Sequence, residues 1–212
     1  TAAALGEPDV GKTEMWHILH ADPGAELFCG LEPATTPAGM KQAIEAGTLE
    51  QHLTRFNVNA GDSVFVAAGT VHAIGAGIVL AEIQQNSDLT YRLYDWNRVD
   101  ASGKARELHI EKGLRATKFD GQPMLKREDK PGRALLELAA SKYFTVQRFE
   151  AQTTRQFSSN GRFTIVLAIG KHATVSTETD QVRLRCGECC LVPACIPVFT
   201  LDSNGPSLVY SA

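Results

Sequence analysis

The sequence has 212 residues, so it is too long for a miniprotein held together by disulfides and long enough for one large domain or two small ones. Hydrophobic residues make up 43% and charged residues 21%, which excludes disordered proteins, and a net charge of -3 offers no basic surface for nucleic acid or an anionic membrane. No apolar run approaches the roughly 20 residues that cross a bilayer, and the N-terminus lacks a signal-peptide pattern, so we expect a soluble, cytoplasmic protein without nucleic-acid or membrane partners.

The first part of the chain predicts two strands and a helical segment. Apolar runs at 14–21 and 25–29 flank the turn sequence Asp-Pro-Gly at 22–24, which favours a β-hairpin. Residues 37–53 then show an approximate 3.6-residue apolar period. A Gly-Thr pair at 47–48 predicts a break of this segment into two short helices.

The remaining elements are short strands in two groups. The first group is expected at 56–58, 63–67, 77–84 and 89–96, with a short helix at 109–115. The second group is expected at 143–149, 163–169, 173–177, 181–185, 189–192 and 208–210. Short strands spaced by turns favour an antiparallel sandwich or barrel. We therefore predict a mainly β chain with a first unit at 1–117, a polar linker at 118–140 and a second unit at 141–212.

Four of the five cysteines lie between positions 186 and 195. An odd number at this spacing makes a disulfide framework improbable. The CxxC spacing of Cys186 and Cys189 is compatible with a zinc knot. However, residues 187–193 alternate like a buried strand, where cysteine acts as a small hydrophobe, and we favour this structural interpretation.

An internal repeat links the two groups of strands. The sequence GDSVFVAAGTVHAI starts at Gly61, and GECCLVPACIPVFT starts at Gly187. Each copy has a glycine that opens a turn, an acidic residue and four strand residues. The position of His72 holds Val198 in the second copy. The pattern predicts a duplicated β-unit in which the first copy kept a site and the second kept the fold.

The spacing from Gly61 through Ala67 and Gly69 to His72 resembles the second motif of the cupin superfamily, with Ala67 in place of the usual proline. This order puts a histidine after a strand and a tight turn, so that its imidazole points into the mouth of a barrel, as a metal ligand would. Considered alone, His72 is equally compatible with a structural role and with a role as a metal ligand.

Three further segments carry a more specific resemblance. Residues 78–98 read IVLAEIQQNSDLTYRLYDWNR, RELH follows at 106–109, and residues 11–16 read GKTEMW. Together they resemble the type I mannose-6-phosphate isomerases of the cupin superfamily. The resemblance implies a bicupin, a pair of double-stranded β-helix units with a helical insertion at about 37–54. It also implies a metal-bearing first unit and a metal-free second unit.

The resemblance implies one divalent metal, usually Zn2+. The family holds it with a glutamine and a histidine from a Gln-x-His-Pro-Asp type segment, a glutamate from the GKTE-like strand and a histidine from the cupin turn. Glu14 and His72 match the last two ligands. The first two have no counterpart, and their segment is expected just before Thr1, which is not methionine. We therefore expect an incomplete and inactive chain whose metal is weak or absent.

The reaction implied by the resemblance is the interconversion of mannose 6-phosphate and fructose 6-phosphate, by proton transfer between C1 and C2 through an enediol. Arg92 matches the active-site arginine of the family, a permanent cation suited to the enediolate. Glu82 matches an acidic residue of the site and is the candidate for proton transfer. Lys12 matches a lysine near the substrate. A phosphorylated hexose is the expected substrate.

Strand alternation provides a check on these assignments. In a regular strand Glu82 shares a face with Leu80 and Gln84. If 91–96 is also a strand, Arg92 faces the same cavity only when the two strands are paired in the right register.

The polar segment 98–108 is either a functional loop or a solvated connection. Its Arg98, Lys104 and Arg106 are candidate ligands of the substrate phosphate, with solvation of a mixed-charge loop as the alternative.

The other histidines are discounted. His17 and His20 lie three residues apart on a strand, so they point to opposite faces and do not chelate a metal together. We give no role to the remaining ones, which are His52, His109 and His172.

A binding module is the alternative to an enzyme. A cupin that has lost catalysis would recognise a sugar or assemble subunits through its exposed strands, and the missing pair of ligands favours this function. The presence of Glu14, His72, Glu82 and Arg92 together favours the isomerase, because binding alone requires no such set. The sequence carries no signal for the oligomeric state.

Overall fold

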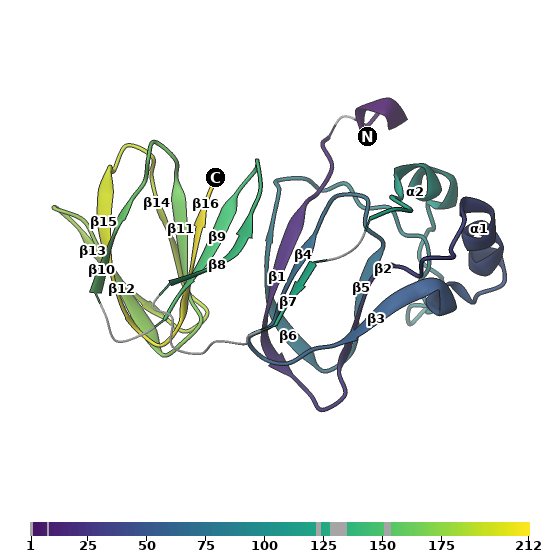
Figure 1. The fold of residues 1–212 in the computed structure, drawn as a ribbon, viewed down its shortest axis with the longest axis horizontal. Helices are drawn as coiled ribbons and strands as arrows, with labels where there is room; N and C mark the ends of the chain where they lie inside the picture. Colours follow the sequence, from purple (N-terminus) through teal and green to yellow (C-terminus); the bar gives the residue numbers. More distant parts are fainter. Residues whose placement is uncertain (1, 8, 122–123, 128–134, 151–153) are drawn as a thin grey trace. The chain divides into compact units, whose positions relative to one another are not determined.

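The computed structural model describes residues 2–7, 9–121, 124–127, 135–150 and 154–212. The chain divides into two compact units, Thr1–Arg127 and Glu128–Ala212, and each contains two β-sheets (Figure 1). The linker expected at 118–140 is not a connector throughout, because it contains the last strand of the first unit and the first strand of the second. Its residues 122–123 and 128–134 lie outside the described part of the chain.

The first unit combines a four-stranded sheet, in the order β6-β1-β4-β7, with a three-stranded sheet, β3-β2-β5. Its elements are a 3-10 helix (Ala3–Leu5), β1 (Glu14–Ala21), β2 (Glu26–Leu31), α1 (Pro37–Glu45), a second 3-10 helix (Leu49–His52), β3 (Leu53–Asn57), β4 (Ser63–Val66), β5 (His72–Ile74), β6 (Ile78–Gln84), α2 (Ile110–Ala116) and β7 (Met124–Lys126). Alternate side chains of each strand point into the unit. The buried core includes Trp16, Ile18, Leu27, Cys29, Val58, Val64 and Val66.

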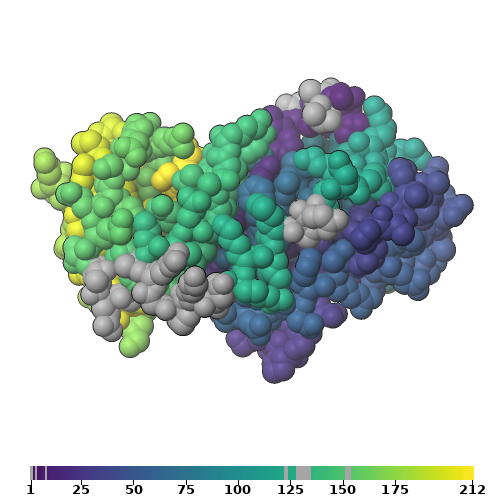
Figure 2. Space-filling view, in the orientation of Figure 1, coloured from purple at the N-terminus to yellow at the C-terminus, as the bar shows by residue number. Residues whose placement is uncertain are grey.

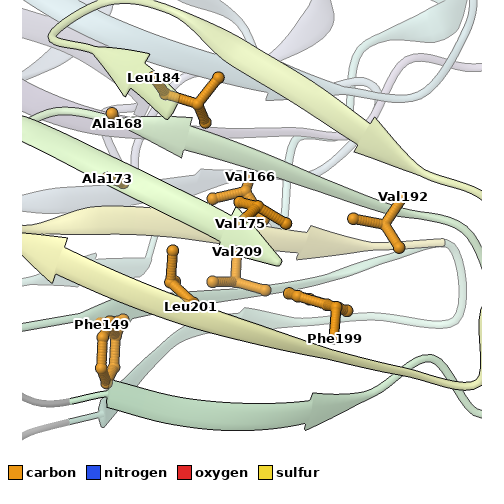
Figure 3. Close-up of a cluster of buried hydrophobic side chains, with 10 residues drawn as sticks. All are labelled: Phe149, Val166, Ala168, Ala173, Val175, Leu184, Val192, Phe199, Leu201 and Val209. Atoms are coloured by element: carbon orange, nitrogen blue, oxygen red, sulfur yellow. The ribbon is translucent and has the colours of Figure 1, made fainter. Parts of the chain in front are cut away.

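The second unit combines a five-stranded sheet, β14-β11-β16-β9-β8, with a four-stranded sheet, β10-β15-β12-β13. Its strands are β8 (Leu135–Ala140), β9 (Thr145–Phe149), β10 (Thr154–Ser158), β11 (Thr164–Ala168), β12 (His172–Ser176), β13 (Gln181–Arg185), β14 (Cys189–Val192), β15 (Val198–Asn204) and β16 (Ser207–Ser211). Apolar side chains from both sheets meet between them, with Val166, Val175 and Val209 side by side (Figure 3).

The hairpin expected at the start of the chain is wrong. β1 pairs with β4 and β6, whereas β2 pairs with β3 and β5, so the two consecutive strands belong to opposite sheets. The turn between them is formed as its sequence predicts, with the Ala25 N–H donating to the Asp22 carbonyl at 2.9 Å and Gly24 at a φ of +82°. Each of the two strands has an apolar face. These faces are better shielded from water when the strands lie in opposite sheets and face each other across the core than when they pair edge to edge.

The repeat predicted from the sequence is present in the backbone. Gly61 and Gly187 have φ values of +96° and +85°, where glycine is favoured. The N–H of Gly61 donates to the carbonyl of Ile18 at 2.8 Å, and that of Gly187 donates to the carbonyl of Ala168 at 2.8 Å. The carbonyl of the acidic residue after each glycine accepts the return bond, at 2.9 and 3.0 Å. The two units therefore use the same turn to join equivalent pairs of strands.

The helical segment breaks where the sequence predicts. The hydroxyl oxygen of Thr36 accepts a hydrogen bond from the Gly39 N–H at 3.1 Å and caps α1, and Gly47 has a φ of +71°. The surfaces of α1 and α2 lie next to each other (Figure 2), joined by an ion pair of 3.0 Å between Lys41 and Glu111. Among the helices of the described residues, none has both the length and the apolar character needed to traverse a lipid bilayer.

The strand expected at 89–96 is not formed, although the structure describes all of these residues. The segment instead runs beside the helices, where Leu93 is buried with Met40 and Leu49. The Tyr94 hydroxyl donates to the Gly47 carbonyl at 2.8 Å. Side chains and helix ends replace a sheet ladder here, so strand alternation does not apply to Arg92.

Candidate active site

Glu14 and His72 meet inside the first unit. Glu14 begins β1 and His72 begins β5, and the two strands belong to different sheets. The Oε2 atom of Glu14 and the Nε2 atom of His72 are 3.8 Å apart, while the Glu14 side chain is 3% exposed and that of His72 is 33% exposed. A buried carboxylate therefore faces an imidazole that solvent can reach.

The ring of His72 is oriented by its own turn. Its Nδ1 atom lies 2.8 Å from the carbonyl oxygen of Thr70, and because a carbonyl only accepts, Nδ1 carries the hydrogen. In the neutral ring, Nε2 then presents its lone pair toward Glu14. A histidine oriented through Nδ1 by a backbone carbonyl is typical of metal ligands.

Two further side chains contact the Glu14 carboxylate. The indole N–H of Trp16 donates to Oε2 at 3.0 Å, and the Nζ atom of Lys12 lies 3.5 Å from Oε1. Trp16 also packs its ring at 5.2 Å and 75° against the ring of His72. Residues 12, 14 and 16 alternate onto one face of the strand, and their hydrogen bonds and charge offset the desolvation of the carboxylate. Trp16 was given no role in the sequence analysis.

Glu82 shares this face of the sheet. It lies opposite Trp16 in the pairing of β1 with β6, and Gln84 lies opposite Glu14. The carboxyl of Glu82 is solvent-exposed. Partial desolvation and the negative charge of Glu14 raise the pKa of Glu82, against the opposite effect of Lys12 and His72. The alternation predicted for Glu82 is formed, and two acidic side chains stand on one face.

Cys29 lines the same interior. It pairs with His72 across β2 and β5 and is fully buried. Burial, together with the charge of Glu14, raises the pKa of Cys29 to about 12. The side chain is thus a neutral thiol at physiological pH.

Arg92 lies in the segment between β6 and α2. It is half-buried, and its Nη1 atom lies 3.5 Å from the carbonyl oxygen of Glu107. The carboxylate of Asp95 binds Arg98 and Arg106 and not Arg92. Within the described residues, Arg92 forms no ion pair.

Asp95 binds two of the three cations expected to hold phosphate. Its side chain is 7% exposed, and its Oδ1 atom accepts from Nη2 of Arg98 at 2.7 Å. Arg106 donates to both oxygens, with a distance of 2.7 Å from Nε to Oδ2. Lys104 is exposed, and its bonds are those of its backbone, whose N–H donates to Oδ1 of Asp100 at 3.0 Å and whose carbonyl accepts from the Asp100 N–H at 2.9 Å. The two arginines therefore fasten the loop at 95–106, a role that the sequence analysis did not assign.

We expect this cluster to make the stability of the first unit depend on pH. Hydrogen bonds from Arg106 and Arg98 lower the pKa of Asp95 from 3.8 to about 2. Because the pKa is lower in the folded state, the contribution is complete above 3.8 and is lost as pH falls toward 2. Asp95→Asn should lower the thermal unfolding midpoint at pH 7, and its difference from the parent protein should shrink below pH 4.

The matched control for this titration is Asp120→Asn, which makes the same change at an exposed position of the same unit. A constant difference between the Asp95→Asn variant and the parent from pH 7 to about 2 would show that the carboxylate charge is not the stabilising element.

The burial expected for the C-terminal cysteines is wrong. Cys186, Cys189 and Cys195 are exposed, and Cys190 is half-buried. Residues 189–192 do form a strand, but β14 lies at the edge of its sheet, so its outward side chains meet solvent. All five cysteines are free. The alternation was identified correctly, and its consequence for burial depended on the position of the strand in the sheet.

Glu14 and His72 provide two donors of the kind that zinc accepts, a carboxylate oxygen and an imidazole nitrogen. Catalytic zinc sites usually have three protein ligands and one open position. Among the described residues, no group of three or more His, Cys, Asp or Glu side chains is arranged to hold a metal ion. The pair therefore fits two of the positions of such a site and does not complete it.

The chain is similar to known proteins along nearly its whole length. The model for "Mannose-6-phosphate isomerase, cupin domain" matches residues 135–211, most of the second unit. The mannose-6-phosphate isomerase of Streptococcus mutans is 33% identical over 201 residues, or 93% of this chain. Nearly the whole chain is therefore similar to mannose-6-phosphate isomerases, and its second unit matches their cupin domain. The chain spans 63% of the length of the S. mutans relative.

Solved structures confirm the predicted bicupin fold. The crystal structure of the Bacillus subtilis mannose 6-phosphate isomerase matches with a TM-score of 0.86 and 29% identity, covering 99% of this chain and 67% of that one. A mannose 6-phosphate isomerase bound with zinc and yttrium matches with a TM-score of 0.70 and 14% identity, covering 94% and 66%. At 14% identity this second likeness shows the fold alone.

The second unit of this chain keeps the fold of the first without its polar site. When the shared turns are aligned, Thr164 takes the position of Glu14, and Val198 begins β15 as His72 begins β5. The space between its sheets is filled by apolar side chains (Figure 3). In this chain the site side chains therefore belong to the first unit.

Proposed function

We propose that the protein is an aldose-ketose isomerase that interconverts mannose 6-phosphate and fructose 6-phosphate. The observation that carries the proposal is the approach of Glu14 to His72, 3.8 Å between Oε2 and Nε2, with Lys12 and Glu82 on the same face. An apolar core does not require the buried carboxylate of Glu14, because a charge is costly to bury, and the lysine and imidazole beside it indicate a polar site. The similarity of nearly the whole chain to mannose-6-phosphate isomerases supports the same reaction.

Glu14 and His72 would hold a divalent cation such as zinc as two of its ligands. A cation bound there supplies Lewis-acid polarisation of a sugar oxygen. The contacts made by Thr70 and Trp16 orient the two ligands, at 2.8 and 3.0 Å.

Glu82 is proposed to move the proton between C1 and C2. A general base works best when its pKa lies near the working pH, and desolvation with the charge of Glu14 raises the pKa of Glu82 in that direction. The open carboxyl can take the proton from one carbon and return it to the neighbouring one. Lys12, beside Glu14, would bind a substrate oxygen, and Arg92 would stabilise the enediolate with its permanent charge.

Of the three predicted ligands of the substrate phosphate, Lys104 is the strongest candidate. Its ammonium makes no ion pair within the described part of the chain, and the residue is exposed. Arg98 already shares the carboxylate of Asp95 with Arg106. Arg98 would therefore contact phosphate only through the guanidinium N–H groups that do not bind Asp95.

The test is a coupled isomerase assay on the intact protein, with metal content measured on the same sample. We expect turnover of mannose 6-phosphate, and Arg92→Ala should lower kcat/KM about a hundredfold. Arg55→Ala, at an exposed arginine of β3, is the matched control and should keep activity. Binding of the sugar phosphate without turnover would contradict the isomerase and favour a binding module. Full activity of Arg92→Ala would remove the role of the arginine.

A further inference from the structure

The main chain of Arg92 is held by a single residue. No sheet ladder binds the segment at 89–96, so its backbone groups need other partners. The Arg92 N–H donates to Nδ1 of His109 at 3.2 Å, and the Arg92 carbonyl accepts from the His109 N–H at 2.7 Å. Both backbone groups of Arg92 are thus bonded to His109.

His109 occupies an unusual place for this contact. It is the N-cap of α2, and its carbonyl accepts from the Gly113 N–H at 2.8 Å. Cap side chains ordinarily accept from the first N–H groups of their own helix, and His109 makes no such bond. Its ring is used for Arg92 instead. The presence of histidine at the cap, where Ser, Thr, Asp or Asn is preferred, is the sequence signal that was missed.

The same helix packs directly on the residues that flank Arg92. At Gly113, one turn into α2, an added Cβ would lie 2.5 Å from Cδ2 of Leu93 and 3.5 Å from Cβ of Tyr91. The rings of Tyr91 and His109 are 6.2 Å apart. Helix and segment are therefore in close contact on both sides of the arginine.

We infer that His109 is a positioning residue that sets the place of the Arg92 guanidinium. This inference rests on the proposed function of Arg92. Nδ1 accepts a hydrogen bond, so the ring acts as the neutral tautomer that carries its hydrogen on Nε2. Removing the acceptor leaves the Arg92 N–H without its partner and frees the segment to tilt. A small displacement is magnified at the end of a long side chain and weakens stabilisation of the transition state.

The experiment compares two substitutions in the intact protein. The amide oxygen of asparagine takes a position like that of Nδ1, so His109→Asn keeps an acceptor, whereas His109→Leu removes it at similar volume. We expect His109→Leu to lower kcat about tenfold or more with KM within about twofold, and His109→Asn to stay within about threefold of the parent. His20→Leu makes the same change at an exposed histidine of β1 and should leave kcat unchanged.

Hydrogen exchange of the Arg92 amide, followed by NMR, tests the hydrogen bond from Arg92 to His109 independently of activity. It should be slow in the parent and in His109→Asn, and about tenfold faster in His109→Leu. If His109→Leu does not fold, His109→Gln serves in its place, because its amide oxygen lies nearer the position of Nε2 than of Nδ1.

The outcomes separate the inference from the proposed function. Unchanged Arg92 exchange in the variant without the acceptor would overturn the inference, as would failure of asparagine to restore kcat. If Arg92→Ala is inactive, faster exchange of the Arg92 amide together with full activity in the His109→Leu variant would also overturn the inference. If Arg92→Ala is itself fully active, the proposed function of Arg92 fails, while the exchange data still decide whether His109 holds its backbone.

Discussion

Replacing Glu14 by glutamine should lower kcat/KM about a thousandfold or more and remove the bound divalent metal. Glutamine keeps the shape of the side chain, and its carbonyl can still accept from Trp16, which bonds Oε2 at 3.0 Å. It loses the negative charge that faces His72 and Lys12. Metal-to-protein ratio and kcat/KM, measured on the same preparation, report the two effects.

The control for this change is Glu26→Gln, which removes a half-exposed carboxylate from β2 of the same unit and should alter neither metal content nor activity. The unfolding midpoint of the Glu14→Gln variant should stay close to that of the parent, which shows that the loss is local. If the Glu14→Gln variant kept both metal and activity, Glu14 would not be a ligand of the metal and the proposed site would be wrong.

Glu82→Gln should reduce kcat by about a hundred- to ten-thousandfold, the range of general acid-base catalysis, while metal content is unchanged. The amide cannot accept a proton from carbon, yet it preserves the size of a side chain that lies opposite Trp16. Exchange of the substrate C2 hydrogen with solvent, followed by NMR in deuterated water, should slow in parallel with kcat.

Glu45→Gln, at an exposed position in α1, is the matched variant and should behave as the parent. Normal isomerisation and normal exchange in the Glu82→Gln variant would assign proton transfer to another group. Loss of metal together with activity would instead make Glu82 part of the metal site.

Local patterns predicted much of the fold. Turn glycines, alternating apolar residues and the repeat at Gly61 and Gly187 identified a duplicated, mainly β chain. Some strands were missed. β10, with the sequence TRQFS, lies at a sheet edge and is mostly exposed, so no apolar alternation marks it. β15 was missed although it lies inside its sheet and buries Phe199 and Leu201. The strand expected at 89–96 is not formed, because its apolar residues are buried against helices and not in a sheet.

The site was predicted unevenly. Glu14, His72 and Glu82 were singled out by their resemblance to a family, and alternation placed Glu82 on the correct face. The contacts between them could not be read from the chain, because Glu14 and His72 are brought together by strands of different sheets. Whether a loop arginine binds substrate or a neighbouring aspartate is likewise a question of folding, and here Arg98 and Arg106 bind Asp95.

The difference between what the sequence predicted and what it did not follows from the range of the interactions involved. Periodicity, turn residues and residue type are properties of neighbouring positions, so the sequence alone was sufficient to predict the β architecture and the duplication. The polar side chains of the site were identified by the resemblance to a family. Partner choice between distant segments depends on how two sheets and the helical segments close around a core. This packing placed β1 and β2 in opposite sheets and brought the Arg92 N–H into a hydrogen bond with His109.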